Sequence, residues 1–153
     1  MAVKTDYTGR SVDLFIFGGA KPQGQQDIAL SFVDNAGQLT TGIQKAIQTF
    51  VMLLLTESGT RQGDSNFGTT FLTELRQANI TSGAIPISFR VAVETILDQQ
   101  RLYITAVDDE TIDTVELLDF SVVDKTNVKL SVKLTTLAGD SRDIILPVSL
   151  AIK

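Results

Sequence analysis

Residues Leu39 to Phe71, LTTGIQKAIQTFVMLLLTESGTRQGDSNFGTTF, decide the fold that this chain is expected to adopt. Apolar residues recur in the first half at spacings of three and four, which predicts the buried face of one helix: Ile43, Ala46, Ile47, Phe50, Val51 and Leu54. A hydroxyl of Thr40 or Thr41 can cap the start of this helix. Gly59 can end it in the left-handed conformation. Met52, Leu53 and Leu55 lie off the main face, so we expect neighbours on more than one side.

A polar loop and an aromatic-glycine corner follow this helix. Arg61 to Asn66 are all polar or small, and Phe67-Gly68 comes directly after them. The simplest interpretation is a surface loop that one buried aromatic holds in place. Beyond the corner, a short helix is expected from Thr69 to Gln77, with three side chains turned inward: Phe71, Leu72 and Leu75. A third helix is expected from Ser88, as N-cap, to about Gln100, with a buried stripe of Phe89, Val93, Ile96 and Leu97.

From Arg101 onward the apolar period changes from that of a helix to that of a strand. Leu102, Ile104 and Ala106 alternate with their neighbours, and Asp108-Asp109-Glu110 is expected to be a solvated turn. Two further strands follow, with apolar faces made of Leu118, Phe120 and Val122 in one and of Val128, Leu130, Val132 and Leu134 in the other. The second alternates with polar residues, as in a sheet that is wet on one side.

The predicted fold class is therefore α+β. About three helices pack on a mostly antiparallel C-terminal sheet, and two short strands, Asp13–Phe17 and Asp27–Val33, precede them. We expect one domain over 1–153, divided into N-terminal strands and loop (1–38), a helical half (39–100) and a β meander (101–153).

The final strand is predicted from the alternation of Ile144, Leu146, Val148, Leu150 and Ile152, and it contains Pro147. Pro147 has no N–H to donate to a ladder, which places its strand at a sheet edge or at a bulge. An apolar edge strand invites pairing with another chain. Pro147 could also be there to discourage such pairing, and the sequence leaves both interpretations open.

Composition excludes several function classes. The 153 residues are 43% hydrophobic and 20% charged, with a net charge of −5 and neither Cys nor His. Nucleic-acid binding would need a basic patch, and thiol chemistry and the commonest metal ligand are missing. The start lacks the apolar core of a signal peptide, and the longest apolar run is short for a membrane span. We expect no cofactor, no metal, no nucleic-acid partner and no membrane partner.

The string LLLTESGTRQGDSNFG resembles the small baseplate wedge protein of contractile phage tails, in the lysozyme-like or GPW family, which has relatives in type VI secretion baseplates. That family usually has Glu before the Arg of the turn, where this chain has Thr60, and Pro with an acid before the aromatic, where this chain has Ser65-Asn66. The family also opens its sheet with Glu-Pro-Arg, which Gln99-Gln100-Arg101 replaces here. The order of elements agrees from about Asp13 to Lys153.

The resemblance implies a structural, non-enzymatic component of a baseplate wedge. Such a protein would link the larger wedge proteins around the tail tube and hub to the first ring of tail sheath subunits, in a six-fold baseplate. It would be made in the host cytoplasm and end in the virion. A guanidinium such as that of Arg101 can make paired bonds to a partner carboxylate. The expected interface residues are Arg61, Asn66, Phe67, Gly68, Gln99, Gln100, Arg101, Ile144, Leu146, Val148, Leu150 and Ile152.

Three alternatives remain at this stage. The family label suggests a peptidoglycan-cleaving enzyme, which needs two carboxylates flanking the scissile bond. Glu57 and Asp64 are the reasonable pair near the loop, although Glu57 at a helix end is more simply a solvated side chain. The second alternative is a type VI secretion baseplate component. The third is a small binding module outside any tail.

Overall fold

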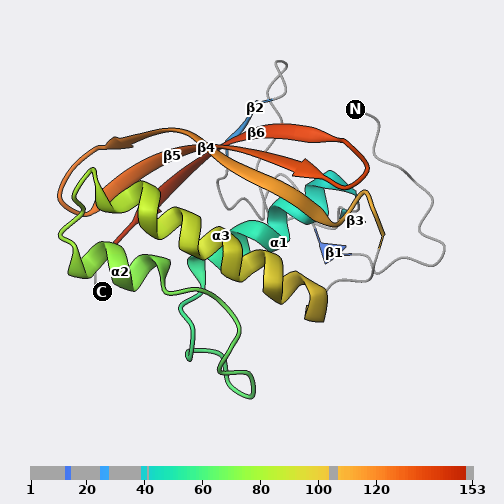
Figure 1. Ribbon diagram of the computed structural model, residues 1–153, viewed down its shortest axis with the longest axis horizontal. Coiled ribbons are helices and arrows are strands. Elements are labelled where there is room, and N and C mark those ends of the chain that lie inside the picture. The colour runs from blue at the N-terminus through green and yellow to red at the C-terminus, as the bar shows by residue number, and fades with distance from the viewer. Residues whose placement is uncertain (1–12, 15–24, 28–38, 41, 104–106, 151–153) are drawn as a thin grey trace.

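The computed structural model describes residues 13–14, 25–27, 39–40, 42–103 and 107–150. It confirms the predicted α+β class: three helices pack on a C-terminal antiparallel sheet (Figure 1). The helices are α1 (Ile43–Leu55), α2 (Phe71–Gln77) and α3 (Ala84–Tyr103). The long strands are β4 (Ile112–Val122), β5 (Asn127–Thr136) and β6 (Ser141–Ser149), and the short ones are β1 (Asp13–Leu14), β2 (Gln25–Asp27) and β3 (Leu39–Thr40).

The main sheet has the strand order β2-β6-β5-β4. Strands β4, β5 and β6 form an antiparallel meander. The short strand β2 adds to the outer side of β6 in parallel, with Gln25 opposite Asp143 and Asp27 opposite Ile145. Of the predicted N-terminal strands, the first is seen over Asp13–Leu14, where it pairs with β3. The second overlaps β2 at Asp27, and the rest of both predictions lies outside the described residues.

One face of the sheet carries the core. The predicted face of β5 is buried throughout (Val128, Leu130, Val132 and Leu134), and helices α1 and α3 run across this side of the sheet (Figure 1). The six predicted stripe residues of α1 and the three of α2 are also buried. Phe89 of α3 joins the three helices, because its ring meets Phe50 at 6.3 Å and Phe71 at 6.1 Å in edge-to-face contacts.

Helix α1 begins and ends differently from its prediction. Its N-cap is Gly42, at φ 65°, a residue with no side chain that could bond the first turn. The predicted cap by Thr40 is wrong because Thr40 belongs to β3; Thr41 lies outside the described residues. The helix ends at Leu55, before the predicted Ser58-Gly59. Leu53 is buried and Leu55 half-buried, but Met52 is exposed.

Helix α3 is longer than predicted at both ends. It begins at Ala84, so Ser88 is a buried residue inside the helix and not its cap. Pro86 lies in the first turn, where its missing N–H interrupts no helical bond. At the other end, Leu102 is helical and 77% exposed, so the predicted start of a strand at Arg101 is wrong. Ile104 and Ala106 lie outside the described residues. The predicted buried stripe is confirmed, with Leu97 only partly buried.

Two irregularities interrupt the pairing of β4 with β5. Ladder partners skip Asp113 in one place and Leu118 in the other. An extra residue shifts the alternation of faces by one. Leu117 and Phe120 therefore both pack against the core, while Leu118 is 49% exposed. The prediction that Leu118 shares a face with Phe120 and Val122 is wrong for this reason.

The prediction of a solvated acidic turn before β4 is wrong for two of its three residues. Asp109 and Glu110 are buried, although this segment was expected to be solvated. The carboxylate of Glu110 forms an ion pair with Lys45 at 3.2 Å and accepts the N–H of Gly42 at 3.3 Å. It therefore serves the start of α1 from a distant part of the chain, where a negative charge is favourable.

Strand β6 is enclosed by two neighbours. It lies between β5 and β2, so the predicted free edge is wrong along Asp143–Ile145. Pro147 lies beyond that pairing, opposite Lys129 of β5. The polar sequence of β2, QQD, carries no strand pattern that could have announced this pairing.

Candidate functional site

The loop between α1 and α2 projects from the body of the protein, at the bottom of the view in Figure 1. Its two ends are joined at the base. Thr69 N–H donates to Thr56 O at 2.9 Å, and Ser58 N–H donates to Thr69 O at 3.0 Å. These bonds make a short parallel bridge between Glu57 and Thr69. The two ends of the loop are therefore held side by side where the loop leaves α1 and returns toward α2.

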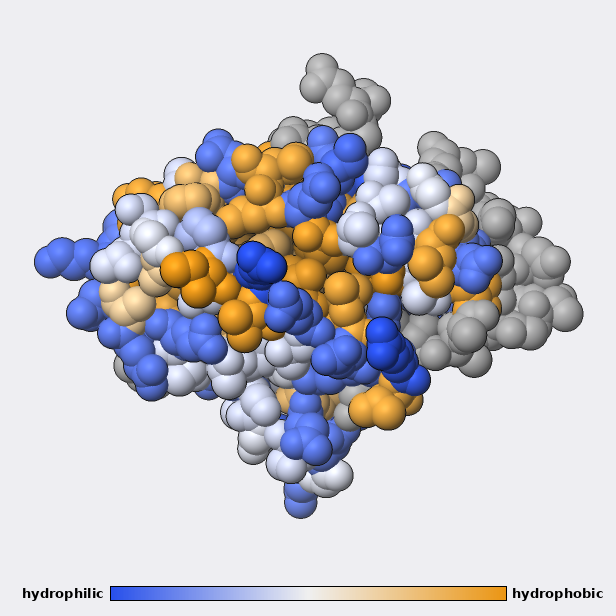
Figure 2. Space-filling view, viewed as in Figure 1, coloured by the Kyte–Doolittle hydropathy of each residue, from blue (hydrophilic) through white to orange (hydrophobic). Residues whose placement is uncertain are grey.

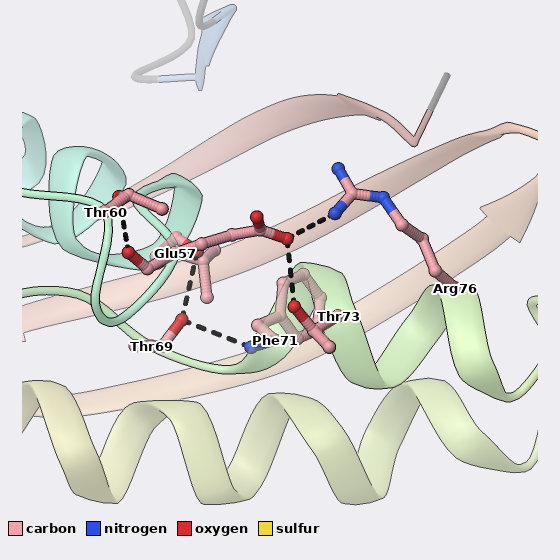
Figure 3. A network of polar contacts seen from close by, with 7 residues as sticks. Glu57, Thr60, Thr69, Phe71, Thr73 and Arg76 are labelled. Atoms are coloured by element: carbon pink, nitrogen blue, oxygen red, sulfur yellow. Dashed lines mark hydrogen bonds and ion pairs between the residues drawn. The ribbon is translucent and has the colours of Figure 1, made fainter. Parts of the chain in front are cut away.

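A network of polar contacts ties this base to both helices (Figure 3). The Glu57 carboxylate accepts the hydroxyl of Thr73 at 3.0 Å and forms an ion pair with Arg76, both on α2. On the other side, the Thr69 hydroxyl donates to Leu54 O, at the end of α1, at 3.1 Å. Within the loop, the Thr60 hydroxyl donates to Glu57 O at 2.6 Å.

These contacts bear on the enzymatic alternative. Glu57 is engaged with α2. Asp64 accepts the N–H of Asn66 at 3.2 Å, a bond that shapes the loop itself. Both carboxylates of the proposed catalytic pair thus take part in holding the loop together.

Gly68 closes the base of the loop, and its position requires glycine. Its φ is 101°, and a Cβ built on it would lie 2.2 Å from Thr56 O. The buried side chain of Gln99, on α3, bonds both backbone groups of Gly68. It accepts the N–H at 3.0 Å and donates to the C=O at 2.6 Å. A side-chain amide thus pairs with a peptide unit as one strand pairs with another.

Gln100 repeats this arrangement at the start of the sheet. Its side chain accepts the N–H of Ile112 at 2.9 Å and donates to the C=O of Ile112 at 2.7 Å. Gly68, Gln99 and Gln100 were expected at a partner interface, and all three are buried within their own chain. The two glutamines hold the loop and the first residue of β4 to α3. Sequence analysis could not see this role, because a polar residue in a helix carries no mark of its distant partner.

The remaining predicted loop residues are accessible. Arg61 and Asn66 are exposed, and the Arg61 guanidinium lies 4.4 Å from the centre of the Phe67 ring. Phe67 is half-buried and packs against the core. This cation–π contact favours a position of the exposed Arg61 guanidinium over the face of the Phe67 ring.

Arg101 is exposed near the end of α3, beside a hollow of about 460 Å³. Asp113 and Leu137 lie on the hollow's other walls. Its full lining is Leu97, Gln100, Arg101, Thr111, Ile112, Asp113 and Leu137.

The predicted interface on the last strand is not available. Ile144, Leu146, Val148 and Leu150 are buried in the core; Ile152 lies outside the described residues. A partner could not contact these side chains unless the sheet opened, so their assignment to an interface is corrected.

No cluster of metal ligands and no membrane-spanning helix is found in the described part of the chain. Over residues 42–103 and 107–150 and the three short strands, no group of three or more acidic residues could hold a metal ion. Within the same residues, none of the helices combines the length and apolar character needed to cross a bilayer.

Comparisons with known proteins add no assignment. No protein-family model matches the sequence, and no curated protein matches it significantly.

Proposed function

We propose that this protein is a structural component of a contractile tail baseplate wedge, which links larger wedge proteins around the tail tube to the first sheath ring. The observation that carries the proposal is the projecting loop, which is polar at its tip and fixed at its base by Gln99, Gly68 and Glu57. This loop is also the segment on which the resemblance to the wedge family rests.

A loop held in this way is suited to recognition. Binding that must order a loop loses affinity to the entropy of ordering, and a loop already fixed avoids much of that cost. Arginine is enriched at protein interfaces, where it often contributes a large share of the binding energy. Arg61, held over Phe67, has the accessibility and the restricted position that such a contact requires.

Arg101 supplies a second contact for the same function. It is the one residue of Gln99-Gln100-Arg101 that is exposed. It can reach a carboxylate of a neighbouring protein above the hollow lined by Asp113 and Leu137. The proposal therefore places partner contacts at Arg61, Asn66, Phe67 and Arg101, and no longer at the last strand.

The test is binding of the full chain to purified large wedge and sheath proteins of one contractile tail, measured by interferometry. Arg61→Glu and Arg101→Glu are each expected to weaken binding by about tenfold, which corresponds to ~1.4 kcal/mol. Lys125→Glu, an exposed charge in the turn between β4 and β5, is the matched control and should bind as the wild type does. A folded wild-type chain that binds neither partner would overturn the proposal.

Two related functions are separated by parallel measurements. Binding to type VI secretion baseplate proteins, but not to phage wedge proteins, would assign the chain to a secretion device. Clearing of a peptidoglycan suspension by the purified protein, abolished by Glu57→Gln, would assign it to the enzymatic alternative.

A further inference from the structure

A groove runs between α3 and the edge strand β4. Its volume is about 480 Å³. Apolar side chains gather along this strip of the surface (Figure 2). The groove is lined by Pro86, Phe89, Arg90, Val93 and Glu94 of α3 and by Val115, Leu117, Leu118, Asp119 and Phe120 of β4.

The apolar surface extends beyond the groove onto the outside of α3. Ile87 and Val91, one helical turn apart, are 69% and 45% exposed. On the other side of the groove, Leu118 and Val122 are also exposed. Exposed apolar residues that gather on both sides of a groove mark an interaction site more often than one isolated exposed residue does.

The edge of β4 is poorly suited to adding a strand. The irregularities at Asp113 and Leu118 break its register, and such bulges blunt sheet edges. The Asp119 carboxylate also accepts the N–H of Phe120 at 2.8 Å. Asp113 and Glu116 add two more charges along the same strand. A helix is the element that fits this groove, because it needs no backbone bonds from β4.

On its α3 side, the groove carries one positive and one negative side chain, Arg90 and Glu94, so the same surface of a second copy would offer it opposite charges. Arg90 and Glu94 both line it, lie one turn apart on α3 and are largely exposed, with 3.6 Å between Arg90 Nε and Glu94 Oε1. If a second α3 lies antiparallel to the first, Arg90 of each copy comes within reach of Glu94 of the other. An interface with a two-fold axis requires this kind of self-complementary surface.

We propose that the chain forms a homodimer in which α3 of each copy lies in the α3–β4 groove of the other. The two helices run antiparallel about a two-fold axis near Val91. Ile87 and Val91 of one copy enter the groove of the other, whose floor is formed by Val115, Leu117 and Phe120, and Arg90 pairs with Glu94 across the axis. A contact of one helix and one groove is small for an interface, so the association is expected to be weak and to depend on protein concentration. This inference does not depend on the proposed baseplate function.

The experiment is sedimentation equilibrium of the full chain over a concentration series. The wild type is expected to dimerise, and Val91→Asp to weaken association by more than about tenfold. Met52→Asp, which places the same charge at an exposed apolar residue of α1 outside the groove, is the matched control and should dimerise as the wild type does. Circular dichroism establishes that each variant is folded.

Charge reversal identifies the geometry. Arg90→Glu and Glu94→Arg should each weaken self-association, because each places like charges opposite one another across the axis. An equimolar mixture of the two variants should associate again, since the carboxylate introduced at position 90 of one chain then faces the guanidinium introduced at position 94 of the other.

Three outcomes would overturn the inference. A wild type that stays monomeric at its highest attainable concentration excludes the dimer. A dimer that neither Val91→Asp nor the charge reversals weaken uses another surface. A monomer whose binding to wedge or sheath proteins is lost in Val91→Asp has a different protein in the groove.

Discussion

The side-chain amide of Gln99 and the peptide group of Gly68, 31 positions apart, form two hydrogen bonds in the buried space between α3 and the base of the projecting loop. This pairing holds the loop at a glycine that no residue with a Cβ could replace without a clash. Gly68 has φ 101° and lies against Thr56 O. The orientation of the loop, and with it the position of Arg61, depends on this contact.

Gln99→Leu is expected to destabilise the protein by about 2–4 kcal/mol, because it leaves the N–H and the C=O of Gly68 buried without partners. Chemical denaturation measures the loss. Amide exchange over the loop should increase as well. Gln77→Leu, at an exposed position on α2, should change the free energy of unfolding by less than ~0.5 kcal/mol. Equal effects of the two substitutions would contradict the role assigned to Gln99.

Gly68→Ala is expected to cost more than about 3 kcal/mol, since it adds a steric clash with the Thr56 backbone to the strain of a positive φ. Gly63→Ala is the matched control within the same loop. Gly63 has φ 87° and no atom within 4 Å of a built Cβ. It should therefore lose only ~1–2 kcal/mol, the cost of the left-handed conformation alone. Thermal denaturation of both variants separates the two contributions.

Lys45→Met is expected to destabilise the fold by about 3–5 kcal/mol, because it removes a cation that lies 3.2 Å from the buried Glu110 carboxylate. Lys45→Met combined with Glu110→Gln should lose less than the sum of the single substitutions. A double-mutant cycle by urea denaturation measures this coupling. Strictly additive losses would show that the ion pair contributes nothing of its own.

Asp124 predicts an acid-dependent contribution to stability. The side chain of Asn127 and the backbone N–H of Thr126 bond its carboxylate, and they lower the pKa of Asp124 below its ordinary value of 3.8. Because the pKa of Asp124 is lower in the folded protein than in the unfolded chain, these bonds stabilise the fold fully at pH values above 3.8. Their contribution is lost as the pH falls through the folded pKa.

Asp124→Asn should therefore be less stable than the wild type at neutral pH, with a difference that shrinks as the pH falls below 3.8. Thermal denaturation across an acid pH series measures it. Asp98→Asn, on the exposed face of α3, provides the comparison. A difference between Asp124→Asn and the wild type that does not vary with pH would contradict the assignment.

The candidate loop shows how far sequence analysis could reach into the site. The sequence from Arg61 to Gly68 predicted a polar loop held in place by an aromatic side chain, and Phe67 does pack against the core. The same string could not show that Gln99 holds Gly68, because that bond joins residues of no shared pattern. It also could not show that Gln99 and Gln100 are unavailable to a partner.

The sequence by itself determined the α+β class, the buried stripes of all three helices and the inward face of β5, since each follows from a periodicity within one segment. Tertiary structure alone decided which edges are covered and which charges are buried. β2 covers β6 from more than a hundred positions away, and Glu110 pairs with Lys45 at the start of α1. Such pairings depend on which distant segments the folded chain brings together, and the residue pattern within one segment does not show which segment will lie beside it.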